Sequence, residues 1–219
     1  MKKYFPLLQR CPLFAGIAPE ELESMLGCLN GQLRPVSRGQ TVFHEGDEAR
    51  WVGIVLEGEV QIFRDDYDGS RSLLGRAGPG QLFGEVFACA GVETLPVTVE
   101  ATREGVILLA DCRRVLTVCR SACAFHNRLI NNLLQVVAEK NLQLNRKIEC
   151  MSARTTRDKL MAFLLSEAKT HRSREFDIPF DRQALADYLG VERSAMSTEL
   201  GTLVRDGVIQ CDRRHFRLL

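Results

Sequence analysis

Neither glycine nor proline occurs in residues 112–151, so nothing in the backbone interrupts this span. Apolar residues within it recur at steps of three, four and seven, so that they would lie in one line along a helix. One polar residue falls in the same line. The members of this line are Ile130, Leu133, Val137, Asn141, Leu144 and Ile148. Such spacing predicts a continuous helix with one apolar face.

A helix of about 30 residues is roughly 40 Å long, which is more than the core of a small domain needs. The apolar stripe therefore predicts a partner, most simply a second copy of the chain related by a two-fold axis. Asn141 lies in the stripe where an apolar residue is expected. A polar residue at such a position commonly fixes the register and oligomeric state of paired helices.

Short apolar runs separated by glycines fill the region from Gln32 to Leu109. Frequent turn residues between such runs are typical of an all-β sandwich or barrel. Val52, Ile54 and Leu56 alternate with other residues, which predicts half-buried antiparallel strands, and Asp68-Gly69 predicts a hairpin turn. No helical segment of about 10 or more residues separates the runs, so a parallel α/β sheet is not expected. Before this region, Pro19 and two glutamates predict the start of a short helix.

The last part of the chain predicts a helix-turn-helix followed by a β-hairpin. Leu185 and Leu189 share one face of a first short helix, and Gly190 supplies the turn. A second helix is expected from about Arg193 to a C-terminal cap at Gly207. The tail after this cap reads as a hairpin, or wing, that carries basic residues.

Side chains of this motif are the candidate DNA contacts. Arginine suits a guanine edge, and short hydroxyls suit phosphates or bases. The predicted DNA-binding residues are Arg182, Gln183, Arg193, Ser194, Ser197, Thr198, Thr202, Arg213 and Arg214. Charge adds little to this prediction, because the whole chain has a formal net charge of only +1, and residues 150–219 hold 12 Lys and Arg against 10 Asp and Glu.

The overall sequence resembles the family of the cyclic-AMP receptor protein and the fumarate-nitrate reduction regulator, the Crp/Fnr family. Five motifs in the family's order carry the resemblance, in residues 12–16 (PLFAG), 39–47 (GQTVFHEGD), 56–60 (LEGEV), 78–85 (GPGQLFGE) and 182–203. The resemblance implies an α+β fold, made of a double-stranded β-roll of the cyclic-nucleotide-binding type, a long dimerisation helix and a winged helix-turn-helix. We expect these parts at residues 1–115, 116–151 and 152–219.

Membership of this family implies a bacterial transcription regulator in which an effector in the β-roll changes the dimer. The two recognition helices then fit successive major grooves, about 34 Å apart. Arg193 corresponds to an arginine that contacts a base in the family. Ser194 and Thr198 occupy sites commonly held by glutamate and arginine, so we expect a different DNA site from that of the best-known members.

The resemblance also locates an effector pocket, at Gly84, Glu85, Leu95, Pro96 and Val97. In members that bind cyclic nucleotides, a Gly-Glu pair holds the ribose, and an Arg-Ser or Arg-Thr pair grips the phosphate. Gly84 and Glu85 match the first pair, and Glu85 is either a ligand contact or a structural loop carboxylate. Leu95-Pro96 replaces the second pair. It supplies no guanidinium, and Pro96 has no backbone N–H to donate. Cyclic AMP is therefore not expected as the effector.

Cysteines leave a second kind of sensor open. Iron–sulfur members of the family use closely spaced N-terminal cysteines, whereas only Cys11 and Cys28 precede the barrel here, so no cluster is expected. Cys119 and Cys123 are one helical turn apart, with Cys112 before them and His126 after them. This set is either a thiol, metal or haem-dependent redox or gas sensor, or a group of small buried side chains.

Other classes of protein fit less well. The sequence shows no Ser/His/Asp order, phosphate-binding glycine loop or metal-spaced histidine pair, so an enzyme is not expected. A regulatory protein that binds cyclic nucleotides but not DNA would leave the helix-turn-helix unexplained. The expected partners are promoter DNA, RNA polymerase, a small-molecule effector and a second copy of the chain. Without a signal peptide or a long apolar segment, the expected location is the cytoplasm, with no membrane contact.

Overall fold

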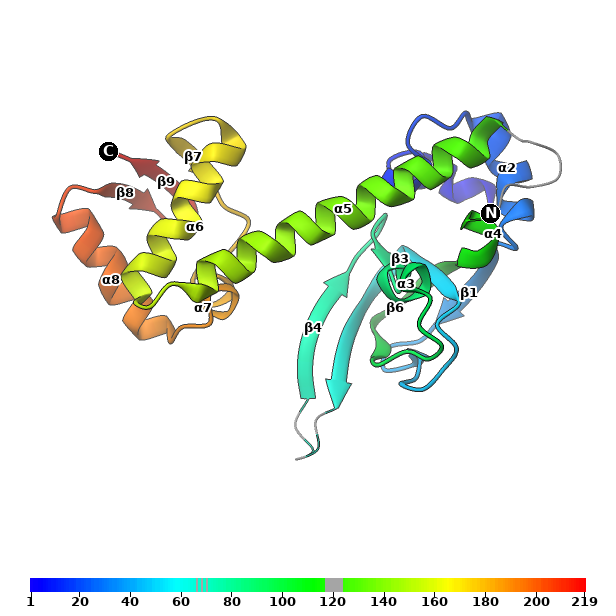
Figure 1. Ribbon diagram of the computed structural model, residues 1–219, viewed down its shortest axis with the longest axis horizontal. Helices are drawn as coiled ribbons and strands as arrows, with labels where there is room; N and C mark the ends of the chain where they lie inside the picture. Colours follow the sequence, from blue (N-terminus) through cyan, green and yellow to red (C-terminus); the bar gives the residue numbers. More distant parts are fainter. Residues whose placement is uncertain (66, 68, 70, 117–123) are drawn as a thin grey trace. The chain divides into compact units, whose positions relative to one another are not determined.

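The computed structural model of the chain describes residues 1–65, 67, 69, 71–116 and 124–219. The chain divides into two compact units, Met1–Ala138 and Glu139–Leu219, each with its own apolar core. The expected β-roll, long helix and winged helix-turn-helix are all present (Figure 1). Within the described residues, no helix has the length and apolar character needed to cross a membrane.

A short helical segment opens the first unit. Its elements are the 3-10 turn η1 (Lys2–Tyr4), α1 (Phe5–Leu8), the 3-10 turn η2 (Pro12–Phe14) and α2 (Pro19–Cys28). Helix α2 begins at Pro19 as expected, because proline is tolerated in the first turn. The Glu21 carboxylate accepts a hydrogen bond from the Ala18 N–H at 3.2 Å, which satisfies one free backbone donor at the helix start.

An antiparallel sheet forms the body of this unit. Its strands are β1 (Gln32–Val36), β2 (Thr41–Phe43), β3 (Trp51–Asp65), β4 (Arg71–Ala77), β5 (Leu82–Phe83) and β6 (Thr98–Asp111). They pair in the order β1-β6-β3-β4, with β2 also on β6 and β5 also on β3. The β3–β4 hairpin expected around Asp68-Gly69 is present, since Asp65 pairs with Arg71. Asp68 itself lies outside the described residues.

Strand β3 departs from the expected half-burial. Residues 52–56 are all buried, not alternately buried and exposed. Val52, Ile54 and Leu56 pack in an apolar core together with residues of α1 and α2. Val55, on the other face of the strand, packs in a second core inside the barrel. The first half of β3 is therefore covered on both faces, which the alternation of side chains does not reveal.

Three helices complete the first unit and lead out of it. They are α3 (Glu85–Ala90), α4 (Cys112–Leu116) and α5 (Ala124–Ser152). The first half of α5 packs through Phe125, Leu129, Leu133 and Val136 on the main apolar core of the first unit, which we call the sensor core. Asn132, also buried, donates through Nδ2 to the carbonyls of Leu13 at 3.0 Å and Ala15 at 2.9 Å.

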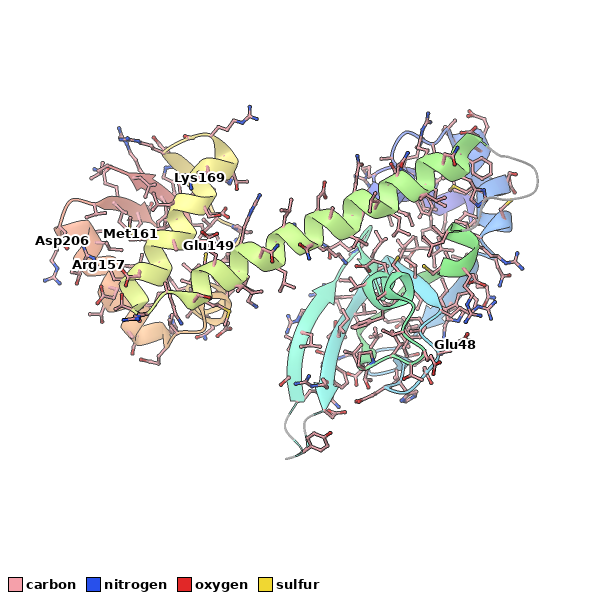
Figure 2. All side chains as sticks on the ribbon, viewed as in Figure 1. Glu48, Glu149, Arg157, Met161, Lys169 and Asp206 are labelled. Atoms are coloured by element: carbon pink, nitrogen blue, oxygen red, sulfur yellow. The ribbon has the colours of Figure 1, made fainter. Side chains whose placement is uncertain are left out.

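The second unit contains three helices and a small sheet in addition to the end of α5. Its elements are α6 (Thr156–His171), β7 (Glu175–Asp177), α7 (Arg182–Leu189), α8 (Arg193–Arg205), β8 (Ile209–Asp212) and β9 (His215–Leu218). The strands pair in the order β7-β9-β8. Arg157 on α6 and Asp206 after α8 form an ion pair at 2.9 Å (Figure 2). Cys150, near the end of α5, is buried in this unit's core.

Candidate DNA-binding and effector sites

Helices α7 and α8 form the predicted helix-turn-helix. The Asp181 carboxylate caps α7 by accepting from the Ala184 N–H at 2.8 Å, and Gly190 ends the helix with φ of 59°. Glu192 caps α8 by accepting from the N–H groups of Ser194 at 3.2 Å and Ala195 at 3.3 Å. The buried sides of the two helices meet in one core, through Leu185, Ala186, Leu189, Met196, Leu200 and Leu203.

The opposite side of α8 carries the predicted DNA-reading residues. Arg193, Ser194, Ser197 and Thr198 are exposed, and Thr202 is half-buried. Three of the hydroxyls donate to the helix carbonyls four residues back, from Ser197 at 2.9 Å and from Thr198 and Thr202 at 3.1 Å. Because the hydroxyl hydrogens are engaged, the Ser197 and Thr198 oxygens can only accept from a ligand, while the Thr202 oxygen already accepts from Arg205 Nη2 at 3.0 Å. This face of α8 therefore offers one guanidinium beside a row of acceptors.

Glu192 gives the start of α8 a fixed negative charge. The Ser194 hydroxyl donates to its carboxylate, and together with the backbone donors this hydrogen bond lowers the pKa of Glu192. Ser194 is thereby held against the helix cap. Of the predicted contacts in this turn, Arg193 alone supplies a cation.

Arg182 and Gln183, at the start of α7, are engaged within the protein. The Arg182 guanidinium lies over the Phe216 ring at 5.3 Å, and its Nη2 donates to the Cys211 sulfur at 3.7 Å. Gln183 donates to Asp187 at 2.9 Å. Arg182 therefore packs α7 against the wing sheet, in addition to any contact it makes with DNA.

The wing is the β8–β9 hairpin. Arg213 and Arg214 lie at its turn and are exposed. Arg213 has φ of 49°, in the left-handed region that non-glycine residues seldom adopt. Both predicted phosphate-contacting arginines thus stand exposed at the hairpin tip.

His215 follows this turn and lies between two carboxylates that sequence reasoning did not associate with it. Its Nδ1 is 3.1 Å from Asp177 Oδ1, and its Nε2 is 3.1 Å from Glu175 Oε1. Both carboxylates belong to β7, which pairs with β9. The hydrogen bonds to Asp177 and then to Glu175 raise the pKa of His215 above its ordinary value of 6.5.

We expect this histidine to make the stability of the second unit pH-dependent. Since its folded-state pKa is raised, the stabilisation is complete below the unfolded pKa of about 6.5 and is lost as pH rises through the folded value. The melting temperature of His215→Gln should therefore fall furthest below that of the unaltered protein at low pH, and the gap should narrow at alkaline pH. Proton NMR titration of the ring tests the cause, and a midpoint at or below 6.5 would contradict it.

The predicted effector residues lie at the start of α3 and before β6. Glu85, the first residue of α3, is 1% exposed, and Gly84 precedes it with φ of 77°. Leu95 and Val97 are buried, whereas Pro96 is exposed. The Leu95 side chain packs in the barrel core with Phe43 and Phe83, so an apolar group fills the position where the family's arginine is expected.

A separate cavity on the barrel was not predicted. It has a volume of about 580 Å³ and is lined by Gln32, Leu33, Arg34, Thr41, Val42, Phe43, His44, Asp47, Glu48, Trp51 and Leu109. These lining residues do not include the five predicted for the effector. Its one arginine, Arg34, donates through Nη1 to the Val42 carbonyl at 2.9 Å.

The predicted cysteine set is only partly described. Cys119 and Cys123 lie outside the described residues. Cys112 is buried, and its Sγ lies 3.7 Å from that of Cys89, which sequence reasoning did not single out. His126 is buried with Nε2 3.1 Å from the Arg114 carbonyl. Over the described parts of the chain, no three His, Cys, Asp or Glu side chains are grouped to hold a metal ion.

Helix α5 places the predicted dimer residues on two faces. Leu133 is 2% exposed and belongs to the sensor core, while Leu144 and Ile148 are 56% and 53% exposed. Leu134 and Met151, which sequence reasoning missed, are 67% and 43% exposed. With them, a line of exposed and half-buried residues follows a strict four-three alternation through Ile130, Leu134, Val137, Asn141, Leu144, Ile148 and Met151. This alternation was the available signal.

Comparison with known proteins assigns both units. Residues 33–122 match the cyclic nucleotide-binding domain family, and residues 158–219 match the Crp-like helix-turn-helix domain family. The chain is 27% identical to the cyclic AMP receptor protein of Thermus thermophilus, over 91% of this chain and 88% of that one. It is 26% identical to the CRP-like cAMP-activated global transcriptional regulator of Mycobacterium tuberculosis, over 94% and 91%.

Solved structures agree in fold. The c-di-GMP responsive global regulator CLP of Xanthomonas campestris has a TM-score of 0.58 at 20% identity, covering 92% of this chain and 99% of that one. DNR from Pseudomonas aeruginosa has a TM-score of 0.54 at 21% identity, and the match covers 100% of this chain and 95% of that one. With both domains in this order, and with relatives that are transcription regulators, the chain belongs to the Crp/Fnr family of DNA-binding transcription regulators.

Proposed function

We propose that this regulator acts as a cytoplasmic homodimer that reads promoter DNA with α8 and grips the phosphate backbone with its wing. Arg193 makes the base contact, Ser194, Ser197, Thr198 and Thr202 add acceptors, and Arg213 and Arg214 contact phosphates. The observation that carries this assignment is the exposed face of α8, where one guanidinium stands beside hydroxyl oxygens whose hydrogens are already engaged.

The dimer forms along the exposed apolar line of α5. The four-three alternation of this line is the pattern of two helices packed side by side. Asn141 lies within it and accepts at 3.0 Å from the Asn145 side chain of the same helix. A side-chain amide inside an apolar seam favours the register in which it meets its own copy.

Effector binding in the β-roll shifts this dimer between forms that do and do not bind DNA. Glu85 at the start of α3 and the apolar positions Leu95 and Val97 line the effector site in this proposal. RNA polymerase is the further partner at the promoter, and the protein catalyses no reaction.

The DNA assignment predicts two separable kinds of defect. Arg193→Ala should lose about 1–3 kcal/mol of discrimination at one base pair, because a guanidinium pairs with guanine through two hydrogen bonds. Arg213→Ala and Arg214→Ala should weaken binding to all sequences alike, and each should reduce the salt slope by about one. Fluorescence anisotropy on a promoter fragment and on base-substituted copies, over a range of salt, measures both.

The two kinds of variant serve as controls for each other. Each variant lacks one arginine of the same unit. A variant that had lost its fold would show both defects, a loss of sequence discrimination and a changed salt slope, whereas each residue is expected to cause only one of them. If Arg193→Ala kept full sequence discrimination, α8 would not read bases through this residue. If Arg213→Ala and Arg214→Ala kept the original salt slope, the wing would not contact phosphate.

A further inference from the structure

Two free thiols meet between α3 and α4. Cys89 lies on α3, Cys112 is the first residue of α4, and their Sγ atoms are 3.7 Å apart. A disulfide bond is about 2.05 Å long, so the two sulfurs need to approach by less than about 2 Å. The other described cysteines, Cys11, Cys28, Cys150 and Cys211, are free thiols as well.

The two thiols differ in character. Cys89 is half-buried, whereas Cys112 is 1% exposed. The hydrogen bond between the two sulfurs lowers the pKa of Cys89 and raises the pKa of Cys112. The more accessible sulfur is thus the one that reaches the reactive thiolate form more readily.

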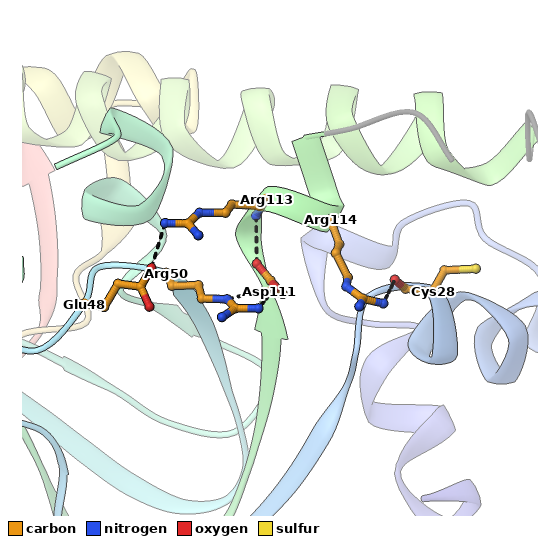
Figure 3. A network of polar contacts seen from close by, with 6 residues as sticks. All are labelled: Cys28, Glu48, Arg50, Asp111, Arg113 and Arg114. Carbon is orange, nitrogen blue, oxygen red and sulfur yellow. Dashed lines mark hydrogen bonds and ion pairs between the residues drawn. The ribbon is translucent and has the colours of Figure 1, made fainter. Parts of the chain in front are cut away.

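Helix α4 makes several polar contacts with neighbouring segments. The Arg113 N–H donates to Asp111 at 3.1 Å, the Arg113 guanidinium donates to Glu48 at 2.7 Å, and Arg114 donates to the Cys28 carbonyl at 3.5 Å (Figure 3). Asp111 is 2% exposed and also pairs with Arg50 at 2.6 Å. Movement of α4 would disturb this network.

Helix α3 carries the other thiol. It is a single short helix between Gly84 and Gly91, which both have positive φ, at 77° and 68°. Glycine adopts such conformations without strain, so neither end of α3 carries a strained backbone. A bond between the two sulfurs would tie α3 to α4, and Glu85 lies on α3.

We propose that Cys89 and Cys112 form a reversible thiol–disulfide modification site that is oxidised by peroxides. The Cys89 thiolate attacks one oxygen of hydrogen peroxide, and the O–O bond breaks. Hydroxide is the leaving group, and Cys89 becomes a sulfenic acid. The Cys112 sulfur then attacks the Cys89 sulfur, the S–O bond breaks, and the Cys112 proton leaves with the hydroxyl as water. The pair loses two electrons to the peroxide, and a dithiol restores the reduced form by exchange.

The chain is well suited to mapping this bond. Trypsin cleavage at Arg76, Arg103 and Arg113 places Cys89 alone on residues 77–103 and Cys112 alone on residues 104–113. Cys119 and Cys123 fall on separate later peptides, because Arg114, Arg120 and Arg128 follow. Mass spectrometry after alkylation of the remaining thiols therefore identifies each cysteine's partner without ambiguity.

Full-length reduced protein is treated with stoichiometric hydrogen peroxide, alkylated and digested. We expect peptide 77–103 joined to peptide 104–113, lost after dithiothreitol and absent from Cys89→Ser. Cys28→Ser and Cys211→Ser, which remove other half-buried thiols, should keep the linked peptide. Linkage of Cys112 to Cys119 or Cys123, or no linkage while Cys28 or Cys211 becomes oxidised, would overturn the proposal.

A second variant tests the order of the two steps and does not depend on the disulfide itself. In Cys112→Ala the sulfenic acid on Cys89 has no resolving thiol, so dimedone should label Cys89 after peroxide treatment. In Cys89→Ala, Cys112 should stay unlabelled. Circular dichroism confirms that both variants are folded. Dimedone on Cys112 and none on Cys89 would reverse the assigned roles and overturn the mechanism.

Discussion

Leu134→Glu should convert the dimer into a monomer at micromolar concentration. The Leu134 side chain is 67% exposed on α5, at a position where the four-three alternation expects an apolar contact with the partner helix. A carboxylate placed there would be desolvated opposite its own copy. Because two linked recognition helices gain about 10²–10⁴-fold over one, promoter affinity should fall by that order. Sedimentation velocity and fluorescence anisotropy measure the two effects.

The neighbouring residues provide the controls. Gln135→Glu adds the same charge at an exposed site outside the line and should leave both the sedimentation coefficient and the DNA affinity unchanged. Leu133→Ala should instead destabilise the sensor unit by about 2–5 kcal/mol, since it opens a cavity in a packed core. Val137→Glu should also dissociate the dimer. A dimeric Leu134→Glu would show that the chain pairs through another surface.

Cyclic AMP and cyclic GMP should not bind measurably in the micromolar range. A buried cyclic phosphate needs its charge met, and a bidentate arginine supplies two charge-assisted hydrogen bonds of roughly 1.5–3 kcal/mol each. Their loss corresponds to about 10²–10⁴-fold in affinity. Here the position is taken by Leu95, which is 4% exposed in the barrel core, and Pro96 has no N–H to offer. A more apolar effector suits this site.

Isothermal titration calorimetry of ligand-stripped protein tests this prediction. The Thermus thermophilus cyclic AMP receptor protein, which the chain resembles along most of its length, serves as the positive control in the same buffer. We expect a clear binding isotherm for the control and none for this protein. Micromolar binding of either nucleotide would mean that another cation reaches the phosphate, and the interpretation of Leu95-Pro96 would have to be withdrawn.

Sequence periodicity located α5 but not the role of each of its faces. Steps of three, four and seven fit Leu133 and Leu134 equally well, because both lie one turn from Ile130 or Val137. Leu133 packs in the sensor core and Leu134 does not. When a helix has two adjacent apolar lines, one can pack in its own domain and the other can contact a partner. The sequence pattern does not say which line does which, and only the packing in the structure distinguishes them.

The local motifs were predictable for a different reason. The helix-turn-helix depends on capping residues and on short-range spacing, so Asp181, Gly190 and Gly207 mark it in the sequence. The Cys89–Cys112 contact joins two helices across strand β6, and no spacing rule brings them together. The His215 environment likewise depends on β7 pairing with β9.

Helix α5 contributes side chains to both cores, Val136 to the first and Cys150 to the second. The natural dividing line between the units therefore lies inside a helix and not in a loop. A sensor fragment that stops before α5 loses Phe125, Leu129, Leu133 and Val136 from its core, whereas one that ends after Ala138 keeps all four. Chimeras that exchange DNA-binding halves between relatives should accordingly join between residues 139 and 149, with the helical phase preserved.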